Sequence, residues 1–353
     1  MTYEEARARF PVLERIAYLN AGTFGPLSRG VMEAVRVEQC RDLEEGRLGR
    51  PYFERVLALR GELRAQIATL VSADSGQVAL TASTTDGCNI VLAGLGLQPG
   101  DEIVTTTDEH FGLLGPLHAS GARVVVAAPD PDAILAAVTP RTKLIAISHV
   151  LWTTGQILPV CELRESSGVP ILADAAQSVG AIPVDAAGLD FLTISGQKWL
   201  CGPDSTGALV VADPERLRVG RPGYFAQAAF EPDGSFVPRD GAQRFEPNWI
   251  PVSALAGLAV ALSQVPEWRY ERSRELAERL RALLAETVEV VTPAERATLV
   301  AFRPPAGKSS ADVVAKLAGA GVQVREIPGT GLIRASVGWW TSESDLDRLV
   351  GGL

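Results

Sequence analysis

The side chain best placed for covalent chemistry in this sequence is Lys198. An apolar run over residues 191–194 predicts a buried strand, and the lysine follows it after three residues, with Trp199 and Leu200 directly behind. Burial disfavours the charged form of an amine and lowers its pKa, and an uncharged amine attacks carbonyl carbon atoms. Lys198 is therefore a candidate attachment point for an aldehyde. The alternative is a lysine at a strand end whose amine lies in water, as most lysines do.

A second candidate site combines hydroxyl groups with the start of a helix. Residues 77–82 predict a strand, Ser83, Thr84 and Thr85 follow directly, and residues 88–95 predict a helix. The free N–H groups and the dipole of a helix N-terminus attract anions, and hydroxyl groups add hydrogen-bond donors. This stretch therefore predicts a phosphate site, with a helix cap that binds no ligand as the alternative.

An acidic and an aromatic side chain complete the set of candidates. Asp174 closes an apolar run at residues 170–173, where a carboxylate is costly unless it is paired. A protonated ring nitrogen would pair it. His110 follows a predicted strand at residues 102–106 and could stack on an aromatic ligand. The alternatives are an aspartate that caps a helix and a histidine on the protein surface.

A mostly parallel sheet would bring these groups together. Apolar runs alternate with helical or turn segments from residue 101 onward, and several are continuous Val, Ile, Leu and Ala runs, as in strands covered on both faces. The sequence therefore predicts an α/β fold with a doubly wound sheet and functional residues beyond the strand ends. The predicted strands span residues 102–106, 123–127, 143–148, 170–173, 191–194 and 207–211.

These groups match the needs of pyridoxal phosphate. Its phosphate requires hydrogen-bond donors, its ring nitrogen requires an acidic partner and its aldehyde requires an amine. The hydroxyl-rich helix start, Asp174 and Lys198 would supply one each. The sequence has no Walker loop and no GxGxxG after a predicted strand, which argues against ATP and dinucleotides.

Composition narrows the class of protein further. The 353 residues carry a net charge of −9 without a basic stripe, so no nucleic-acid partner is expected. No apolar segment is as long as a membrane span, and the first residues lack a secretory signal pattern. We therefore expect a cytoplasmic protein without membrane contact. Four scattered cysteines without CxxC, and only three histidines, predict neither a disulfide scaffold nor a metal site.

The chain after residue 250 predicts a second unit. Residues 268–286 predict a long amphipathic helix, and three strands and two helices of an α+β unit follow. We therefore expect an N-terminal segment at residues 1–20 that joins this unit, a large α/β domain at residues 21–250 and a small α+β domain at residues 251–353.

The motifs at these positions resemble those of class V enzymes of the fold-type I pyridoxal-phosphate group, which includes cysteine desulfurases and isopenicillin-epimerase-like proteins. The resemblance extends from Tyr18 to Leu349. Within the group, the chain is most similar to cystine C–S lyases in YLNAGTFGPL, AISHVLWTTGQILPV and the pair Arg325 and Arg334. The segments that carry the wider resemblance are TASTTDGCN, DEHFGLLGP, ADAAQSVG, SGQKWLCGP, RFE at residues 244–246 and IRASVGWWTSESDLDRL.

The resemblance implies a role for each matching residue. Lys198 would form the Schiff base with the cofactor, Asp174 would hold the pyridine nitrogen and His110 would stack on the ring. Arg334 would clamp the substrate α-carboxylate with bidentate geometry, and Arg325 would meet a distal carboxylate. Salt bridges within the C-terminal unit are the alternative for both arginines. The other implied ligands are Gln177 at the ring hydroxyl, Thr84, Thr85, Ser195 and Gln197 at the phosphate, and Asn20 at the substrate.

Three departures from the family pattern bear on the chemistry. Gln197 stands where the family usually has histidine, and its amide can still donate to a phosphate oxygen. The residues PNW at 247–249 follow the RFE motif in place of a threonine that reaches the phosphate of the neighbouring subunit. No cysteine lies between Lys308 and Arg334, where desulfurases carry a reactive thiol. This absence argues against a persulfide relay.

The expected reaction is β-elimination from cystine or an S-substituted cysteine, which gives pyruvate, ammonia and a sulfur product. Lys198, once released from the cofactor, would remove the α-proton. An aminotransferase or an epimerase would use the same cofactor residues, and a non-catalytic protein that binds pyridoxal phosphate is a further alternative. The resemblance also implies a small amino-acid substrate and a homodimer, with residues 47–50 as candidates to cross its interface.

Overall fold

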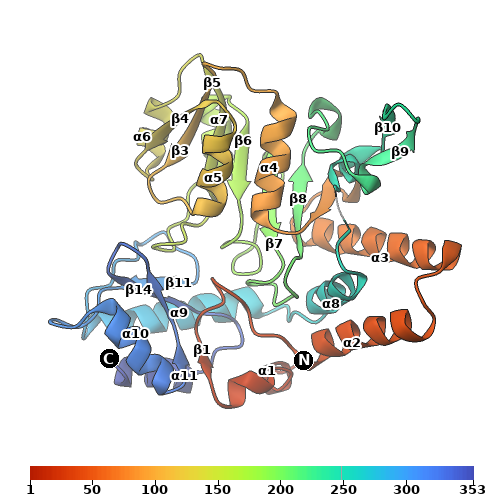
Figure 1. Ribbon diagram of the computed structural model, residues 1–353. Coiled ribbons are helices and arrows are strands. Elements are labelled where there is room, and N and C mark those ends of the chain that lie inside the picture. Colours follow the sequence, from red (N-terminus) through yellow and green to blue (C-terminus); the bar gives the residue numbers. More distant parts are fainter. Residues whose placement is uncertain (248) are drawn as a thin grey trace.

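The computed structural model describes residues 1–247 and 249–353, and its centre is a seven-stranded sheet (Figure 1). The strand order is β2-β8-β7-β6-β5-β3-β4. Neighbours from β7 to β4 run parallel, whereas β8 is antiparallel to both β2 and β7. The strands are β2 (Val78–Thr81), β3 (Glu102–Thr106), β4 (Arg123–Ala127), β5 (Thr142–Ser148), β6 (Ile171–Asp174), β7 (Phe191–Ser195) and β8 (Gly207–Val211).

Helices pack against both faces of this sheet, so its central strands are buried on both sides. Every residue of β6, β7 and β8 is buried, which explains why their sequences are almost continuously apolar. One face shares an apolar core with α4 (Thr84–Leu95) and α5 (Phe111–Ala119). The other face shares a core with α3 (Gly49–Leu70), α6 (Pro131–Ala136), α7 (Val160–Ser167) and α8 (Val252–Ser263).

A smaller α+β unit follows in the chain and lies below the large sheet in Figure 1. Its antiparallel sheet has the order β11-β14-β13, and three helices share a single apolar core with it. The elements are β11 (Leu299–Phe302), β12 (Val322–Gln323), β13 (Arg325–Ile327), β14 (Leu332–Ser336), α9 (Arg269–Ala285), α10 (Ser310–Gly319) and α11 (Glu343–Gly351).

The N-terminal segment packs on this smaller unit before it joins the large one. Strand β1 (Ala17–Tyr18) pairs in parallel with β12. An ion pair of 2.8 Å between Arg7 and Asp345 fastens α1 (Tyr3–Arg7) to α11. The chain then passes close to both units and enters α2 (Arg29–Glu44), whose first turn is capped by the hydroxyl of Ser28. A hairpin of β9 (Gln227–Phe230) and β10 (Phe236–Pro238) projects from the large unit (Figure 1).

The α/β class and the positions of the predicted sheet strands are confirmed, and one detail differs. Helix α4 begins at Thr84 rather than at residue 88, because the side chain of Ser83 caps it there. Helix α3 begins at Gly49, and a proline at residue 51 fits its first turn, where the missing N–H has no partner to lose. In the small unit, β12 and β13 follow each other closely in the chain but pair with different strands.

The proposed domain limits at residues 20 and 250 stay a prediction. Helix α8 begins beyond residue 250, yet Leu255 and Leu258 belong to the apolar core beneath the large sheet. None of the helices in the described part of the chain is long and apolar enough to cross a bilayer.

Candidate active site

Lys198 faces a cavity of about 300 Å³ at the carboxyl ends of the sheet strands. Loops that follow β2, β3, β5, β6 and β7 form most of its wall, and the loop before α2 and two strands of the small unit complete it. All predicted site residues line this cavity except Asp174 and Asn20. The lining residues are Gly22, Thr23, Phe24, Ser83, Thr84, Thr85, His110, Trp152, Gln177, Ser195, Gln197, Lys198, Arg325 and Arg334.

The environment of Lys198 favours an uncharged amine. Burial lowers its pKa to about 8, and Arg334 and Arg325 act in the same direction, while Asp174 acts against them. The backbone of the lysine loop is fixed by the segment before α2, where the N–H of Gly25 donates to the carbonyl of Gln197 at 2.8 Å. A β-carbon at Gly25 would overlap the Lys198 carbonyl. The sequence therefore needs glycine at this point for the two loops to approach so closely.

Asp174 is buried and does not itself line the cavity. Its side chain is 5% exposed and accepts a hydrogen bond of 2.9 Å from the N–H of Ala176. Burial raises its pKa, whereas Lys198, Ala176 and Thr193 lower it. The charges of Asp174 and Lys198 each act on the pKa of the other side chain. The sequence predicts a buried acid and a buried amine at one site, and their roles toward a cofactor stay a prediction.

The start of α4 provides hydrogen-bond donors on one side of the cavity. Thr84 and Thr85 occupy its first turn, where backbone N–H groups have no partner within the helix. On the opposite side, the hydroxyl of Ser195 donates to Oε1 of Gln197 at 2.7 Å. This bond orients the glutamine so that its amide nitrogen remains a donor for a ligand. Thr84, Thr85 and the amide nitrogen of Gln197 offer donors that suit a phosphate, and Ser195 would add one by turning its hydroxyl away from Gln197.

His110 is neutral in this environment. Partial burial lowers its pKa to about 4, and Lys198, Arg325 and Arg334 add to the effect. Its Nδ1 accepts from the N–H of Gly112 at 3.0 Å, so Nε2 bears the proton. The ring also meets the indole of Trp152 edge to face, with centroids 5.1 Å apart.

Gln177 is fixed at both ends of its amide. Its Nε2 donates to the carbonyl of Gly22 at 2.8 Å, and its Oε1 accepts from the indole N–H of Trp199 at 3.0 Å. The second hydrogen on Nε2 remains available, so the predicted contact with a ring hydroxyl would use that hydrogen.

Two guanidinium groups meet across a single hydroxyl. Thr23 Oγ1 accepts from Nη1 of Arg325 at 3.0 Å and from Nη2 of Arg334 at 3.5 Å. It donates to Oδ1 of Asn20 at 2.8 Å. Asn20 therefore contacts Thr23 rather than the cavity itself, which places it behind the predicted substrate site.

Arg334 is the more enclosed of the two arginines. It is 1% exposed, and its Nη1 donates to the carbonyl of Trp152 at 2.7 Å. Burial lowers its pKa to about 9, and Arg325 adds to the effect. No carboxylate of the described residues forms an ion pair with either arginine. Unpaired buried cations favour a bound anion.

Sequence reasoning missed Thr23 and Trp152 as individual site residues. Both lie in the segments that carry the resemblance to cystine C–S lyases, YLNAGTFGPL and AISHVLWTTGQILPV, and this was the available signal. Their residue types alone do not mark a site, because threonine and tryptophan occur in many structural settings.

The RFE motif has a structural role outside the cavity. Glu246 is 2% exposed and accepts hydrogen bonds from Nε of Arg60 at 3.0 Å, Nη1 of Arg64 at 2.9 Å and the N–H of Leu80 at 3.1 Å. It therefore ties α3 to β2, the strand that precedes the hydroxyl-rich turn.

Trp249, which follows this motif, does not line the cavity of its own chain. Trp249 is 45% exposed and packs among aromatic rings, including Tyr52 and Tyr224. Asn248 lies outside the described residues. A contact of this segment with the phosphate of a neighbouring subunit stays a question for the dimer.

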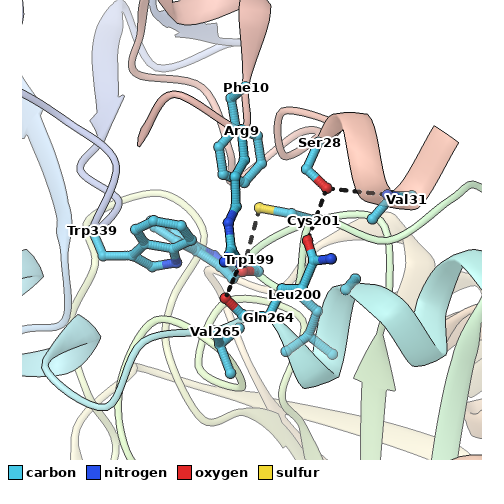
Figure 2. A pocket seen from close by; sticks show the side chains of 11 residues that line it. Arg9, Phe10, Ser28, Val31, Trp199, Leu200, Cys201, Gln264, Val265 and Trp339 are labelled. Atoms are coloured by element: carbon cyan, nitrogen blue, oxygen red, sulfur yellow. Dashed lines mark hydrogen bonds between the residues drawn. The ribbon is translucent and has the colours of Figure 1, made fainter. Parts of the chain in front are cut away.

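A second, much smaller cavity lies behind the lysine loop (Figure 2). Trp199, Leu200 and Cys201 form one wall, and its volume is about 10 Å³, room for no more than a single water molecule. Figure 2 shows the hydroxyl of Ser28 between the side-chain Oε1 of Gln264, to which it donates, and the N–H of Val31, from which it accepts. The backbone carbonyl of Gln264 accepts from Nη1 of Arg9. It is too small for a substrate.

Comparison with known proteins assigns the chain to a family. A model of the aminotransferase class-V family matches residues 54–349. The chain belongs to this family. It is 30% identical to an isopenicillin N epimerase of Streptomyces clavuligerus, with 99% of this chain and 97% of that protein covered. It is 29% identical to the cysteine desulfurase CsdA of Escherichia coli strain K12, with 98% and 95% covered.

Solved structures of class-V relatives have the same fold. The complex of the cystine C–S lyase C-DES with its reaction product cysteine persulfide matches with a TM-score of 0.90 at 27% identity, and 97% of this chain and 98% of that one are covered. A C-DES mutant with glycine covalently linked to its pyridoxal-phosphate cofactor matches with the same score and identity, over 98% of both chains. These matches confirm the predicted family resemblance and the fold-type I architecture.

The residues of this chain fit pyridoxal phosphate. An amine with a lowered pKa, a buried carboxyl group beside it, a neutral histidine and a helix start with two threonines all meet at one cavity. These groups match the aldehyde, the ring nitrogen, the ring face and the phosphate of the cofactor.

Proposed function

We propose that this class-V enzyme uses pyridoxal phosphate to cleave the Cβ–S bond of cystine or an S-substituted cysteine, with pyruvate, ammonia and a sulfur product as the result. The observation that carries the proposal is the pair of guanidinium groups, Arg325 and Arg334, which share Thr23 and face the same cavity as Lys198. One cation suits the α-carboxylate of any amino acid. The second suits a substrate with a further acidic group, as cystine has.

Each cofactor group would meet its own protein residues. Lys198 would bind the aldehyde carbon, Asp174 would keep the ring nitrogen protonated and His110 would cover the ring face. Gln177 would donate to the ring hydroxyl. The phosphate would be bound by Thr84, Thr85, Ser195 and Gln197. When bound, the cofactor supplies an electron sink for the substrate Cα.

Lys198 would also move the proton that starts the reaction. Once substrate replaces it on the cofactor, its Nζ is a free amine next to the substrate Cα. A pKa lowered from 10.5 to about 8 raises the uncharged fraction near neutral pH, and an uncharged amine is the form that acts as a general base. Arg334 would fix the α-carboxylate, so that the Cα–H bond stays within reach of Nζ.

The cysteines of the chain support direct release of the sulfur product. Cys88 and Cys201 are buried, and burial raises the pKa of each thiol, which disfavours the reactive thiolate. Cys40 and Cys161 are the other two, and none of the four lines the cavity. Without a thiol acceptor at the site, the sulfur would leave on a small molecule rather than on the protein.

An epimerase is the second candidate, and the 30% identity to isopenicillin N epimerase favours it over an aminotransferase. All three activities need the same cofactor residues, so the cofactor site does not separate them. The second cation at Arg325 supports the lyase, although isopenicillin N also has more than one acidic group. A non-catalytic role is disfavoured because Lys198, Asp174 and Arg334 are all in place.

The reaction products test the proposal. Purified holoenzyme is incubated with L-cystine, L-cysteine and S-methyl-L-cysteine, and pyruvate and ammonia are assayed, with Lys198→Ala as the inactive control. We expect pyruvate and ammonia in equal amounts, formed fastest from cystine. Loss of optical activity without pyruvate would indicate an epimerase, and amino-group exchange with a keto acid would indicate an aminotransferase. Either result would refute the lyase proposal.

A further inference from the structure

Glu109 has a buried carboxyl group and directly precedes His110, which lines the cavity. The glutamate is 6% exposed and does not line the cavity itself. Buried carboxyl groups are costly and are normally paired with a cation. Within the described residues, no basic side chain forms an ion pair with Glu109. The reason for its burial must therefore lie in the neutral groups that its oxygen atoms bind.

Both oxygen atoms of Glu109 accept hydrogen bonds at the ends of two neighbouring strands. Oε1 accepts from the hydroxyl of Thr106, the last residue of β3, at 2.7 Å. Oε2 accepts from the hydroxyl of Ser148, the last residue of β5, at 2.5 Å. The backbone nitrogen of Ser148 lies 3.0 Å from both oxygen atoms. The carboxyl group therefore ties the chain that follows β3 to the end of β5.

The donors offset part of the cost of this burial. Burial raises the pKa of Glu109 to about 7, whereas the hydrogen bonds from Ser148 and Thr106 act against the rise. Hydrogen bonds to a carboxylate are shorter and stronger than those between neutral groups. The segment between β3 and His110 is thus held mainly by Glu109.

His110 makes a second contact between the same two segments. Its ring packs edge to face against Trp152, which lies in the loop after β5, with centroids 5.1 Å apart. The bond from the N–H of Gly112 to Nδ1 stays within the chain at the start of α5, so it does not place the ring relative to β5. Two adjacent residues, Glu109 and His110, therefore fix one loop to the other.

Glu102, at the opposite end of β3, shows a different use of a buried glutamate. It is 1% exposed and accepts from Thr139, Arg123 and Arg141. Two guanidinium groups compensate its charge, as expected for a structural ion pair. Glu109 has no such compensation, and it is the glutamate next to a residue of the cavity.

We infer that Glu109 is a positioning residue, whose carboxyl group holds the imidazole of His110 against the face of the cofactor ring by binding the end of β5. It would touch neither cofactor nor substrate. This assignment rests on the proposed function, since it takes pyridoxal phosphate as the occupant and His110 as the residue that covers its ring. It does not depend on which bond of the substrate is cleaved.

A double-mutant cycle on Glu109 and His110 tests the inference. The full-length variants Glu109→Gln, His110→Ala and their combination are freed of cofactor and titrated with pyridoxal phosphate, and protein fluorescence gives the Kd. Loss of one ring contact costs up to about tenfold in affinity, which we expect for His110→Ala. Glu109→Gln should weaken binding in the same direction. The double variant should bind no more weakly than His110→Ala, because Glu109 acts through a ring that is then absent.

A spectroscopic signal gives an independent measure of positioning. The visible circular dichroism of the bound cofactor depends on how its ring is held by the protein. At saturating pyridoxal phosphate, this signal should decrease in Glu109→Gln. Ser148→Ala, which removes one of the donors, should act in the same direction, and its effect should also disappear in the His110→Ala background. It covers the case in which Glu109→Gln does not fold.

Glu102→Gln is the matched control, because it alters a buried glutamate at the other end of the same strand. It should change the Kd of pyridoxal phosphate by no more than about twofold, since distant sites act independently. It should leave the visible circular dichroism unchanged.

Three results would overturn the inference. One is an additive loss of affinity in the double variant, which would show that Glu109 acts independently of His110. Another is an unchanged Kd and an unchanged circular dichroism signal in folded Glu109→Gln. The third is a His110→Ala variant that binds pyridoxal phosphate as tightly as the unaltered protein. An unaltered protein that binds no pyridoxal phosphate would refute the proposed function and this inference together, so the two failures are distinguishable.

Discussion

At the residue scale, three cationic side chains face one cavity. Burial lowers the pKa of Lys198, and Arg334 and Arg325 lower it further, while burial and Arg325 lower the pKa of Arg334. Charges of one sign in an enclosed site repel one another strongly. Anionic ligands relieve that repulsion, so the site should prefer ligands with more than one acidic group.

The variant Arg325→Gln tests this preference. Cystine has a second carboxylate for Arg325 to bind, whereas S-methylcysteine has none. We expect the KM of cystine to rise about tenfold, as loss of one hydrogen bond to a charged group would cause. The KM of S-methylcysteine should change less than threefold. Steady-state pyruvate assays with both substrates measure the difference, and Arg303→Gln, on an exposed pair with Glu289, is the control variant.

Equal increases for the two substrates would contradict the role of Arg325 in binding a distal carboxylate. They would show instead that it acts by supporting Arg334 through Thr23.

Residue chemistry predicted part of this site and not the rest. Lys198 and Asp174 were identifiable because a charged group in an apolar stretch is costly and therefore needs a reason. Thr23 was not, because its importance comes from Arg325, which lies 302 positions further along the chain. The same is true of Trp152, which lines the cavity only because Arg334, far along the chain, binds its carbonyl.

At the scale of elements, the site depends on strand ends that are held in register. Ser148 at the end of β5 lies opposite Asp174, and Asp174 lies opposite Thr193 in β7. Strand β2 supplies the start of α4, and its N–H at Leu80 is bound by Glu246. The buried Glu246 therefore stabilises the strand that leads to the predicted phosphate site.

The variant Glu246→Gln should lower the free energy of unfolding by about 3 kcal/mol, because it removes the carboxylate that pairs with the buried Arg60 and the partly buried Arg64. Urea unfolding followed by circular dichroism measures the loss. Glu215→Gln is the control, since Glu215 is 67% exposed where it pairs with Arg244, and exposed pairs contribute about 1 kcal/mol or less. Equal losses in the two variants would show that Glu246 does not anchor β2.

The elements were more predictable than their arrangement. Apolar runs located β3, β4 and β8 at their observed limits. Strands β3 and β8 are buried along their whole length, which requires such residues, whereas the edge strand β4 is partly exposed. The placement of β2 at the edge beside β8 was not predictable. It results from pairing between residues 78–81 and 207–210, and no local pattern encodes that contact.

At the scale of the whole molecule, an apolar hollow opens next to the active-site cavity. Phe24 and Gln197 line both spaces, and the hollow has a volume of about 570 Å³. Phe24 and Met32 are each 50% exposed, and Leu27 is 39% exposed. Contiguous exposed apolar surface of this kind is typical of protein interfaces.

We therefore expect a homodimer in which a second copy covers this hollow. Sedimentation equilibrium at micromolar concentration should give twice the 37.4 kDa mass of one chain. Met32→Asp should shift the equilibrium toward monomer, because it would bury an unpaired charge at the interface. A single-chain mass for the unaltered protein would contradict the dimer. Normal dimerisation of the Met32→Asp variant would show that the interface lies elsewhere. Residues 47–50, where the connection from α2 enters α3 at the right of Figure 1, stay a candidate interface segment.

The proposed function depends most directly on Lys198 as the residue that binds pyridoxal phosphate. The chain has only four lysines, and the other three, Lys143, Lys308 and Lys316, are exposed and lie outside the cavity. The decisive measurement is borohydride reduction of the holoenzyme, followed by digestion and mass spectrometry of the peptides. We expect the phosphopyridoxyl mass on the peptide that contains Lys198, and no label in the Lys198→Ala variant. The same label on another lysine, or an undiminished label in the variant, would contradict it.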